Sequence, residues 1–270
     1  MNFEDTFIGR PNTVSTYRSL FKHHIKPFIY SESHKNEMWL KHLLKCWNEQ
    51  GLSRRTRQML LRLSRDYIAF LGGPNINTKQ LARTLERSEQ QKELIVLNNK
   101  EDNILMKTAA ALDPKFYPIL LLGLHAGLRR GEIFGLRCGD IDMFKNRIRV
   151  AHNYDGPTKN GKTRYVPMSV ELESAMISAR NLLMKPTDSK IFESQDPNPK
   201  LRRLLKAAKL PILRFHDLRH SFATMALESG VSPRQVADWL GHSSTNTTIS
   251  IYWNLTKNTA SLDFLPGGIK

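Results

Sequence analysis

The 270-residue sequence predicts a mainly α-helical protein with one small antiparallel β-sheet, organised as two domains. Apolar residues recur three and four positions apart through most of the chain, as they do on one face of a helix. Between about 141 and 167 they alternate or cluster as in strands, around turn signals at Lys145-Asn146 and Asn160-Gly161. A hydrophilic linker at about 88–94 separates a helical domain over 1–90 from a second domain over 95–270, of which 254–270 form a C-terminal tail.

The first domain is predicted to contain helices only. Apolar stripes lie over 14–25, 39–47 and 60–70, and a shorter fourth helix is expected from Thr78 to about Arg87. Ser53 is a suitable N-cap for the third helix. The residues expected on the buried face of that helix are Leu60, Leu63, Tyr67 and Phe70.

The second domain mixes two periodicities. Helices are predicted at 100–112 and 116–127, and the strands include Ile141, Ile148, Val150 and 165–167. Helical periodicity returns over 170–184 and 201–208 and fills most of 216–253. The sequence therefore predicts a helical domain with one small sheet inserted into it.

The net charge narrows the classes of partner. Lys and Arg number 41 against 25 Asp and Glu, which gives a formal net charge of +16, and the pI is near 10.0. A surplus of this size suits nucleic acid, although a solvated basic surface and an anionic membrane surface are alternatives. No apolar run reaches the roughly 18 residues of a spanning helix, and no signal-peptide core follows Met1, so we expect no membrane partner.

The start of the third predicted helix is strongly basic. It reads Ser53-Arg54-Arg55-Thr56-Arg57, with Arg62 and Arg65 one and two turns later. Such a run is usually a solvated helix face. Few acidic residues accompany this one, so phosphate contact is an equal alternative. The candidate DNA contacts are Arg54, Arg55, Arg57 and Arg62.

Neither cysteine nor carboxylate clusters predict a metal. Cys46 and Cys138 are far apart and match no zinc-ligand spacing. Both lie in apolar, helical contexts, so we expect buried thiols in a reducing cytoplasm rather than a disulfide. We expect no metal and no other cofactor.

Four stretches of the second domain carry residues that could act together on a phosphodiester. In Gly127-Leu128-Arg129-Arg130-Gly131-Glu132-Ile133, Arg129 and Glu132 lie three apart at a helix start. The carboxylate can therefore hold the guanidinium in place for a bidentate phosphate contact, although a surface salt bridge is commoner. In Thr158–Thr163, an Asn-Gly hairpin places Lys159 and Lys162 at its tip. A lysine there can protonate a leaving alkoxide, or it can serve solubility alone.

The remaining two stretches lie near the end of the chain. In His216-Asp217-Leu218-Arg219, a guanidinium and an imidazole share a helix face. The first can clamp a phosphoryl group and the second can exchange a proton near neutral pH, although a buried structural histidine is the alternative. Leu240-Gly241-His242-Ser243-Ser244 is followed, ten residues after His242, by Tyr252, which on its own is typical of a core aromatic.

Together these stretches resemble the tyrosine recombinase (phage integrase) family, especially its Xer-like members. The order Arg, Lys, His-x-x-Arg, His, Tyr is that of the family, and the residues that flank each position are similar to the family's. Ala126–Leu136 resembles the first arginine box, Lys159 falls seven residues before Val166-Pro167, and His216–Thr224 fits the second arginine box almost letter for letter. The resemblance is strong over about 95–265. It is weaker over 12–88, which resembles the family's helical core-binding domain.

The resemblance implies a site-specific DNA recombinase that cuts and rejoins DNA without metal or ATP. By this resemblance, Tyr252 is the nucleophile that forms a 3′-phosphotyrosyl bond, and His216 accepts its proton. The residues that would stabilise the phosphoryl charge are Arg129, Arg219 and His242, and Glu132 would support Arg129. Lys159 would be the acid that protonates the departing 5′ oxygen. Lys162 is expected to contact the DNA backbone.

The implied partner is double-stranded DNA that carries a specific recombination site. Monomers or weak dimers would assemble as a homo-tetramer on two such sites. The expected location is the cytoplasm, at the nucleoid, with a prokaryotic, viral or mobile-element origin.

Two other classes share part of the pattern. A type IB topoisomerase uses similar chemistry, but the Leu-Gly-His box and the small helical front domain argue against it. A DNA-binding regulator without catalysis is disfavoured because no catalytic position is missing from the sequence.

Overall fold

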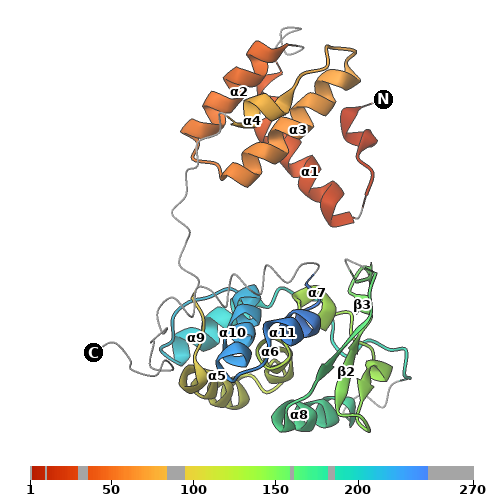
Figure 1. Cartoon of the computed structure of the whole chain (residues 1–270), viewed down its shortest axis with the longest axis vertical. Coiled ribbons are helices and arrows are strands. Elements are labelled where there is room, and N and C mark those ends of the chain that lie inside the picture. Colours follow the sequence, from red (N-terminus) through yellow and green to blue (C-terminus); the bar gives the residue numbers. More distant parts are fainter. Residues whose placement is uncertain are drawn as a thin grey trace, which may run out of the picture. The chain divides into compact units, whose positions relative to one another are not determined.

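The computed structural model describes residues 2–9, 11–29, 36–83, 95–158, 161–181 and 186–242. It confirms a mainly helical fold with small antiparallel sheets (Figure 1). The chain divides into two compact units, Met1–Glu93 and Leu94–Lys270, each with a hydrophobic core of its own. The division falls inside the stretch expected to be the linker, whose residues lie outside the described ones.

In its described part, the first unit consists of helices packed around α3. The elements are η1 (Phe3–Thr6), α1 (Pro11–His24), η2 (Lys26–Phe28), α2 (Glu37–Glu49), α3 (Arg54–Phe70) and α4 (Thr78–Arg83). Helices α1, α2 and α4 each pack on α3. The indoles of α2 tie it to the end of α1 and to η2, because Trp47 donates to the carbonyl of His24 at 3.0 Å and Trp39 to that of Phe28 at 3.1 Å.

Helix α3 begins where the sequence predicts. The Ser53 Oγ accepts a hydrogen bond from the Thr56 amide at 3.2 Å, which confirms the cap. Leu60, Leu63 and Tyr67 are buried as expected, but Phe70 is 40% exposed. Phe70 is the last residue of the helix, where its ring meets Phe3 of η1 with a centroid separation of 5.5 Å and is covered only in part. The fourth predicted helix is present from Thr78 to Arg83, and its expected last turn lies outside the described residues.

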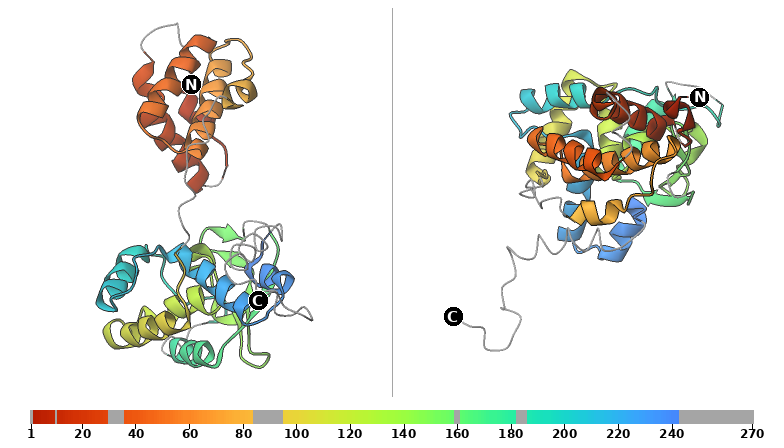
Figure 2. Two further views of the ribbon diagram at one scale, coloured as in Figure 1. Left: turned by 60° about the vertical axis from the view of Figure 1, so that its left-hand side comes forward. Right: turned by 90° about the horizontal axis from the view of Figure 1, so that it is seen from above.

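The second unit is built around α6. Its elements are α5 (Asn99–Leu112), α6 (Tyr117–Leu124), α7 (Arg130–Ile133), η4 (Cys138–Asp140), β1 (Ile141–Asp142), β2 (Arg147–Val150), β3 (His152–Asn153), β4 (Gly156–Pro157), β5 (Arg164–Pro167), α8 (Val170–Asn181), α9 (Asn198–Ala207), α10 (Phe215–Glu228) and α11 (Pro233–Leu240). Every residue from Ile119 to Leu124 is buried. A helix that is apolar all round needs cover on all sides, and α6 packs against α5, α8 and α10 (Figure 2).

The small sheet has the order β1-β2-β5 with antiparallel pairs, in which Ile148 lies opposite Val166 and Val150 opposite Arg164. Strands β3 and β4 form a separate antiparallel pair. We expected the Asn160-Gly161 turn to join two paired strands, and in the described residues this is wrong: β4 pairs with β3 and β5 with β2. The Gly161 amide nevertheless donates to the Thr158 carbonyl at 2.9 Å, between the described residues on either side of Lys159-Asn160. Strand β2 has four residues and β4 only two, so β2 can pair with all four residues of β5.

Both cysteines are free thiols. Cys138 is buried as expected. Cys46 is only half-buried, because it does not lie on the buried face of α2, and its sulfur is 3.7 Å from Nε2 of His42. Among the described helices, none combines the length and the apolar character needed to span a bilayer.

Candidate active site

Residues from several segments of the second unit meet at a cavity of about 430 Å³. Its lining consists of Arg129, Glu132, Thr158, Lys162, Thr163, Arg164, Ala237, Asp238, Gly241 and His242. The structure thus brings the neighbouring pair Arg129 and Glu132 together with His242, which lies far from them in the sequence. Lys162 also lines the cavity, and so does a third arginine, Arg164, which was not predicted as a site residue.

Arg129 and Glu132 form the predicted ion pair at the start of α7. The Arg129 amide donates to Glu132 Oε2 at 2.8 Å, and Nη1 donates to Oε1 at 2.8 Å. The side chain of Glu132 is only 5% exposed, so the pair is not a surface salt bridge. The Arg129 side chain is 33% exposed, which leaves part of its guanidinium facing the cavity.

Arg219 lies on α10 beside this pair and is almost completely buried. It donates to the Gly127 carbonyl at 2.7 Å through Nη1 and to the Leu240 carbonyl at 2.5 Å through Nη2. Gly127 has φ of 60°, and a Cβ there would lie 2.5 Å from the Phe222 ring, so the close approach requires glycine. Burial, and then the charge of Arg129, lower the pKa of Arg219 to about 9, which leaves the guanidinium charged at neutral pH.

Arg164 on β5 is the residue that the sequence analysis missed. Its Nη1 and Nη2 donate to the two carboxylate oxygens of Glu132 at 2.9 and 2.7 Å, and its Nε donates to the Trp239 carbonyl at 2.6 Å. A sequence signal was available, because Arg164 and Val166 point to the same face of a strand and Val166 belongs to the core. An arginine on a buried face needs a carboxylate partner.

The three arginines converge on the C-terminal end of α11. The Trp239 carbonyl accepts a hydrogen bond from Arg164. The Leu240 carbonyl accepts from both Arg129 and Arg219, and the Gly241 carbonyl accepts from Arg129. The last carbonyls of a helix have no partner inside the helix, and cationic groups stabilise that end. Gly241 then turns the chain with φ of 62°. The arginines therefore set the position of His242, the next residue.

The histidines of the site are neutral at neutral pH. Burial, followed by the charges of Arg219 and Arg129, lowers the pKa of His242 to about 4. Burial and the neighbouring His220 and arginines also lower the pKa of His216, although Asp217 opposes the shift. The rings of His216 and His220 meet edge to face with their centroids 5.4 Å apart. A neutral imidazole can accept a proton at one nitrogen and donate one at the other.

Two expected site residues, Lys159 and Tyr252, lie outside the described residues. Lys162, which was expected only to contact the DNA backbone, lines the cavity. The Thr158 hydroxyl donates to the Lys162 carbonyl at 3.0 Å, so Lys162 is held beside Thr158 at the cavity.

The basic run on α3 divides into exposed and buried members. Arg55 and Arg62 are exposed and Arg54 is half-buried. Arg57 is only 3% exposed and donates to the side chain of Asn48 on α2, the helix that packs on α3. Contrary to expectation, Arg57 does not offer its guanidinium to a phosphate in this structure, because it lies on the face of α3 that contacts α2.

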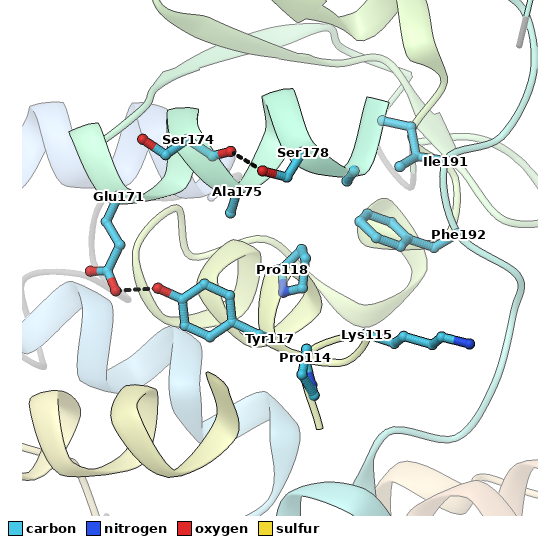
Figure 3. A pocket seen from close by; sticks show the side chains of 11 residues that line it. Pro114, Lys115, Tyr117, Pro118, Glu171, Ser174, Ala175, Ser178, Ile191 and Phe192 are labelled. Carbon is cyan, nitrogen blue, oxygen red and sulfur yellow. Dashed lines mark hydrogen bonds between the residues drawn. The ribbon is translucent and has the colours of Figure 1, made fainter. Parts of the chain in front are cut away.

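A larger cavity, of about 790 Å³, lies elsewhere in the second unit between α6 and α8 (Figure 3). Its walls are mostly apolar and include Pro118, Ile191 and Phe192. Tyr117 points to Glu171 at one end and donates a hydrogen bond to it. Burial and Glu171 raise the pKa of Tyr117 well above its ordinary value, which makes it a poor nucleophile. The described residues include no cluster of metal-binding side chains.

Comparison with known proteins assigns the family. Residues 87–259, more than half of the chain, match the phage integrase family. The chain belongs to the phage integrase family.

Individual relatives agree with this assignment. The tyrosine recombinase XerD of Oceanobacillus iheyensis is 25% identical over 273 residues, which cover 94% of this chain and 89% of that protein. The tyrosine recombinase XerA of Saccharolobus solfataricus is 28% identical over 194 residues, which cover 71% of this chain but 58% of that protein. The Tn1549 transposon integrase, solved in complex with transposon right end DNA, superposes with a TM-score of 0.72 at 20% identity over 95% of this chain and 96% of that one, and it shares the fold.

Proposed function

We propose that this protein is a site-specific DNA recombinase that cuts and rejoins duplex DNA through a 3′-phosphotyrosyl bond to Tyr252. The observation that carries the proposal is the convergence of Arg129, Arg219 and the neutral His242 beside one cavity, in a chain of the phage integrase family. Guanidinium groups and a neutral imidazole are donors to non-bridging phosphate oxygens, on which charge grows during displacement.

The two arginines have different access to a phosphate. Arg129 is one-third exposed, and its bonds to the carbonyls of Leu240 and Gly241 are long, at 3.3 and 3.2 Å, so a phosphate can replace them. Arg219 is buried and acts through its charge at short range. Direct contact between Arg219 and the phosphate requires exchange of its 2.5 Å bond to the Leu240 carbonyl.

The nucleophile is assigned to Tyr252 on the resemblance and on its distance along the chain. Of the seven tyrosines, the five in the described residues are absent from the lining of the arginine cavity. Tyr252 follows His242 by ten residues, a tether that spans at most about 35 Å. His216, neutral at pH 7, is suited to accept the phenol proton. Lys159 is the proposed acid for the leaving 5′ oxygen, with Lys162 on the DNA backbone.

The wider setting follows from the same chemistry and from the relatives. Guanidinium groups take the place of a metal clamp, and religation reuses the phosphotyrosyl ester, so neither metal nor ATP is required. The structure of the Tn1549 transposon integrase was solved in complex with transposon right end DNA, which supports duplex DNA with a specific site as the partner of this protein. We further propose assembly as a tetramer on two sites, in a prokaryotic, viral or mobile-element setting in the cytoplasm.

A suicide substrate, nicked within its site so that the cleaved fragment diffuses away, tests the proposal. The wild-type chain should form a covalent adduct on a denaturing gel, and Tyr252→Phe should bind DNA but form none. Tyr165→Phe is the matched control, because this exposed ring stacks on Arg147 outside the cavity and should leave the adduct unchanged. An adduct that survives in Tyr252→Phe would exclude this nucleophile. Binding without any adduct in the wild type would favour a regulator, and an adduct without strand exchange between two sites would favour a topoisomerase.

A further inference from the structure

We infer that Arg164 is a positioning residue for strand cleavage: it occupies the Glu132 carboxylate and so keeps the Arg129 guanidinium available to the scissile phosphate. The inference rests on the proposed function. It concerns a residue of β5, 35 positions beyond Arg129 in the sequence, that belongs to none of the motifs on which that proposal rests.

The carboxylate of Glu132 is filled to its capacity. Oε1 accepts from Arg129 Nη1 at 2.8 Å and from Arg164 Nη1 at 2.9 Å. Oε2 accepts from the Arg129 amide at 2.8 Å and from Arg164 Nη2 at 2.7 Å. A carboxylate offers about four acceptor positions. Arg164 holds two of them in the parallel, bidentate arrangement, so the Arg129 guanidinium can make only one bond to Glu132.

Loss of Arg164 would free two of these positions for Arg129. A bidentate pair is the strongest arrangement available to a guanidinium and a carboxylate. The bonds that now hold the rest of the Arg129 guanidinium, at 3.3 Å to Leu240 and 3.2 Å to Gly241, are too long to compete with it. Arg129 would therefore close onto Glu132 and turn away from the cavity that it now lines.

Arg164 itself does not act on the substrate. Each of its three guanidinium nitrogens donates to a protein acceptor, and its side chain is only 11% exposed. Its third bond, 2.6 Å to the Trp239 carbonyl, ends three residues before His242. Gly241 allows this contact, since a Cβ there would lie 3.0 Å from the Arg164 side chain. Arg164 thus acts through Arg129 and His242.

The test measures single-turnover cleavage of the suicide substrate and, separately, DNA affinity. Arg164→Gln should slow cleavage by about 100-fold, the scale expected when a reacting group is misplaced by about an ångström. DNA affinity should stay within about threefold of the wild type, since Arg164 does not reach the substrate. Arg164→Lys retains the charge but lacks the two parallel bonds and should slow cleavage by about tenfold.

The deciding variant is the double substitution Glu132→Gln with Arg164→Gln. A neutral amide does not trap Arg129, so the double variant should cleave at least tenfold faster than Arg164→Gln alone. A purely structural role for Arg164 predicts the reverse, an additional loss. The matched control is Arg149→Gln. It removes an arginine of β2, in the same sheet, from another buried carboxylate, that of Asp140 in η4 (2.9 Å), and should leave cleavage unchanged.

The outcomes separate this inference from the proposed function. No adduct with the wild-type chain contradicts the proposed function itself. If the wild type forms an adduct and Arg164→Gln cleaves at the same rate, or if the double variant is no faster than Arg164→Gln, the positioning role is overturned. If circular dichroism shows that Arg164→Gln does not fold, the double variant decides: cleavage within about tenfold of the wild type supports the role, and a folded double variant about 100-fold slower overturns it.

Discussion

Replacing Glu132 by Gln should destabilise the second unit, and the penalty should depend on pH. Burial by itself raises the pKa of Glu132, but the hydrogen bonds and charge of Arg164, and then those of Arg129, lower it to about 2 from an ordinary value of 4.5. In the unfolded chain, the Glu132 carboxyl has its ordinary pKa again. The stabilising contribution is therefore fully present above about pH 4.5 and is lost as the pH falls toward 2.

The size of the effect follows from the two pKa values. Each pH unit between them corresponds to about 1.4 kcal/mol, so the ionised carboxylate contributes about 3 kcal/mol to the free energy of unfolding at pH 7. This agrees with the loss of about 3–5 kcal/mol that is usual when one partner of a buried ion pair is removed. At pH 3.5 the unfolded chain already binds a proton at this position, and about 1.4 kcal/mol of the contribution is gone. The penalty for Glu132→Gln should shrink by that amount, because Gln does not titrate.

Native-state hydrogen exchange on the full chain at pH 7 and pH 3.5 measures this penalty. The buried amides of α6 and α10 report the free energy of opening of the second unit, and those of α2 and α3 report the first unit as an internal control. Glu228→Gln, at the exposed end of α10, should change the free energy by no more than about 0.5 kcal/mol. A penalty below about 1 kcal/mol at pH 7, or one that is the same at pH 3.5, would refute the role of Glu132 as the ionised partner of both arginines.

Three further predictions concern the DNA reaction. Lys159→Ala should slow cleavage by about 100-fold or more and recover on DNA with a 5′-bridging phosphorothiolate, because a thiolate leaves without a proton; rescue of Lys162→Ala instead would assign the acid to Lys162. Adduct formation should persist in EDTA without nucleotide, and a strict magnesium requirement for cleavage would contradict the arginine clamp. Arg55→Ala should lower the salt dependence of DNA binding by about one ion. Arg57→Ala should leave that slope unchanged and destabilise the first unit by about 1–3 kcal/mol, whereas the opposite pattern would mean that Arg57 reaches DNA.

The helices could be predicted because their signals are local. The cap of α3 needs only Ser53 and the amide three residues later, and α6 is apolar all round within eight residues. Strand pairing is different, because the Asn160-Gly161 signal says that the chain turns but not which strand β5 pairs with. The partner is β2, whose Ile148 and Val150 lie in the core, and that choice depends on burial across the whole unit.

The orientation of Arg57 was available in the sequence but was hidden by its basic neighbours. Arg57 precedes Leu60 and Leu61 by three and four residues, and both leucines are buried in the core. Positions three and four apart share a helix face. The spacing therefore predicts that Arg57 points inward, while the composition of the run predicts a basic surface. Burial of the apolar stripe decides the rotation of the helix, and Arg57 follows it toward Asn48.

The candidate site could be predicted only where its contacts are close in the sequence. Arg129 and Glu132 are three residues apart, so their ion pair follows from helix geometry. The acceptors of Arg164 lie 32 and 75 residues away, at Glu132 and Trp239, and no local pattern links them. Alternation along β5 places Arg164 on the buried face, but it does not say which carboxylate it meets.

The charge balance of the site connects its stability with the proposed reaction. Three guanidinium groups, those of Arg129, Arg164 and Arg219, surround one carboxylate, that of Glu132. The pKa of Arg219 is lowered first by its burial and then by the charges of Arg129 and Arg164. About two positive charges remain uncompensated in a partly buried space, which disfavours folding. A phosphodiester brings about one negative charge, and displacement at phosphorus concentrates further charge on its oxygens. The excess is therefore matched better by the transition state than by the bound substrate, which is the condition for catalysis. Before DNA binds, the hydrogen bonds to the backbone carbonyls of residues 239–241 hold the three guanidinium groups close to one another despite their repulsion.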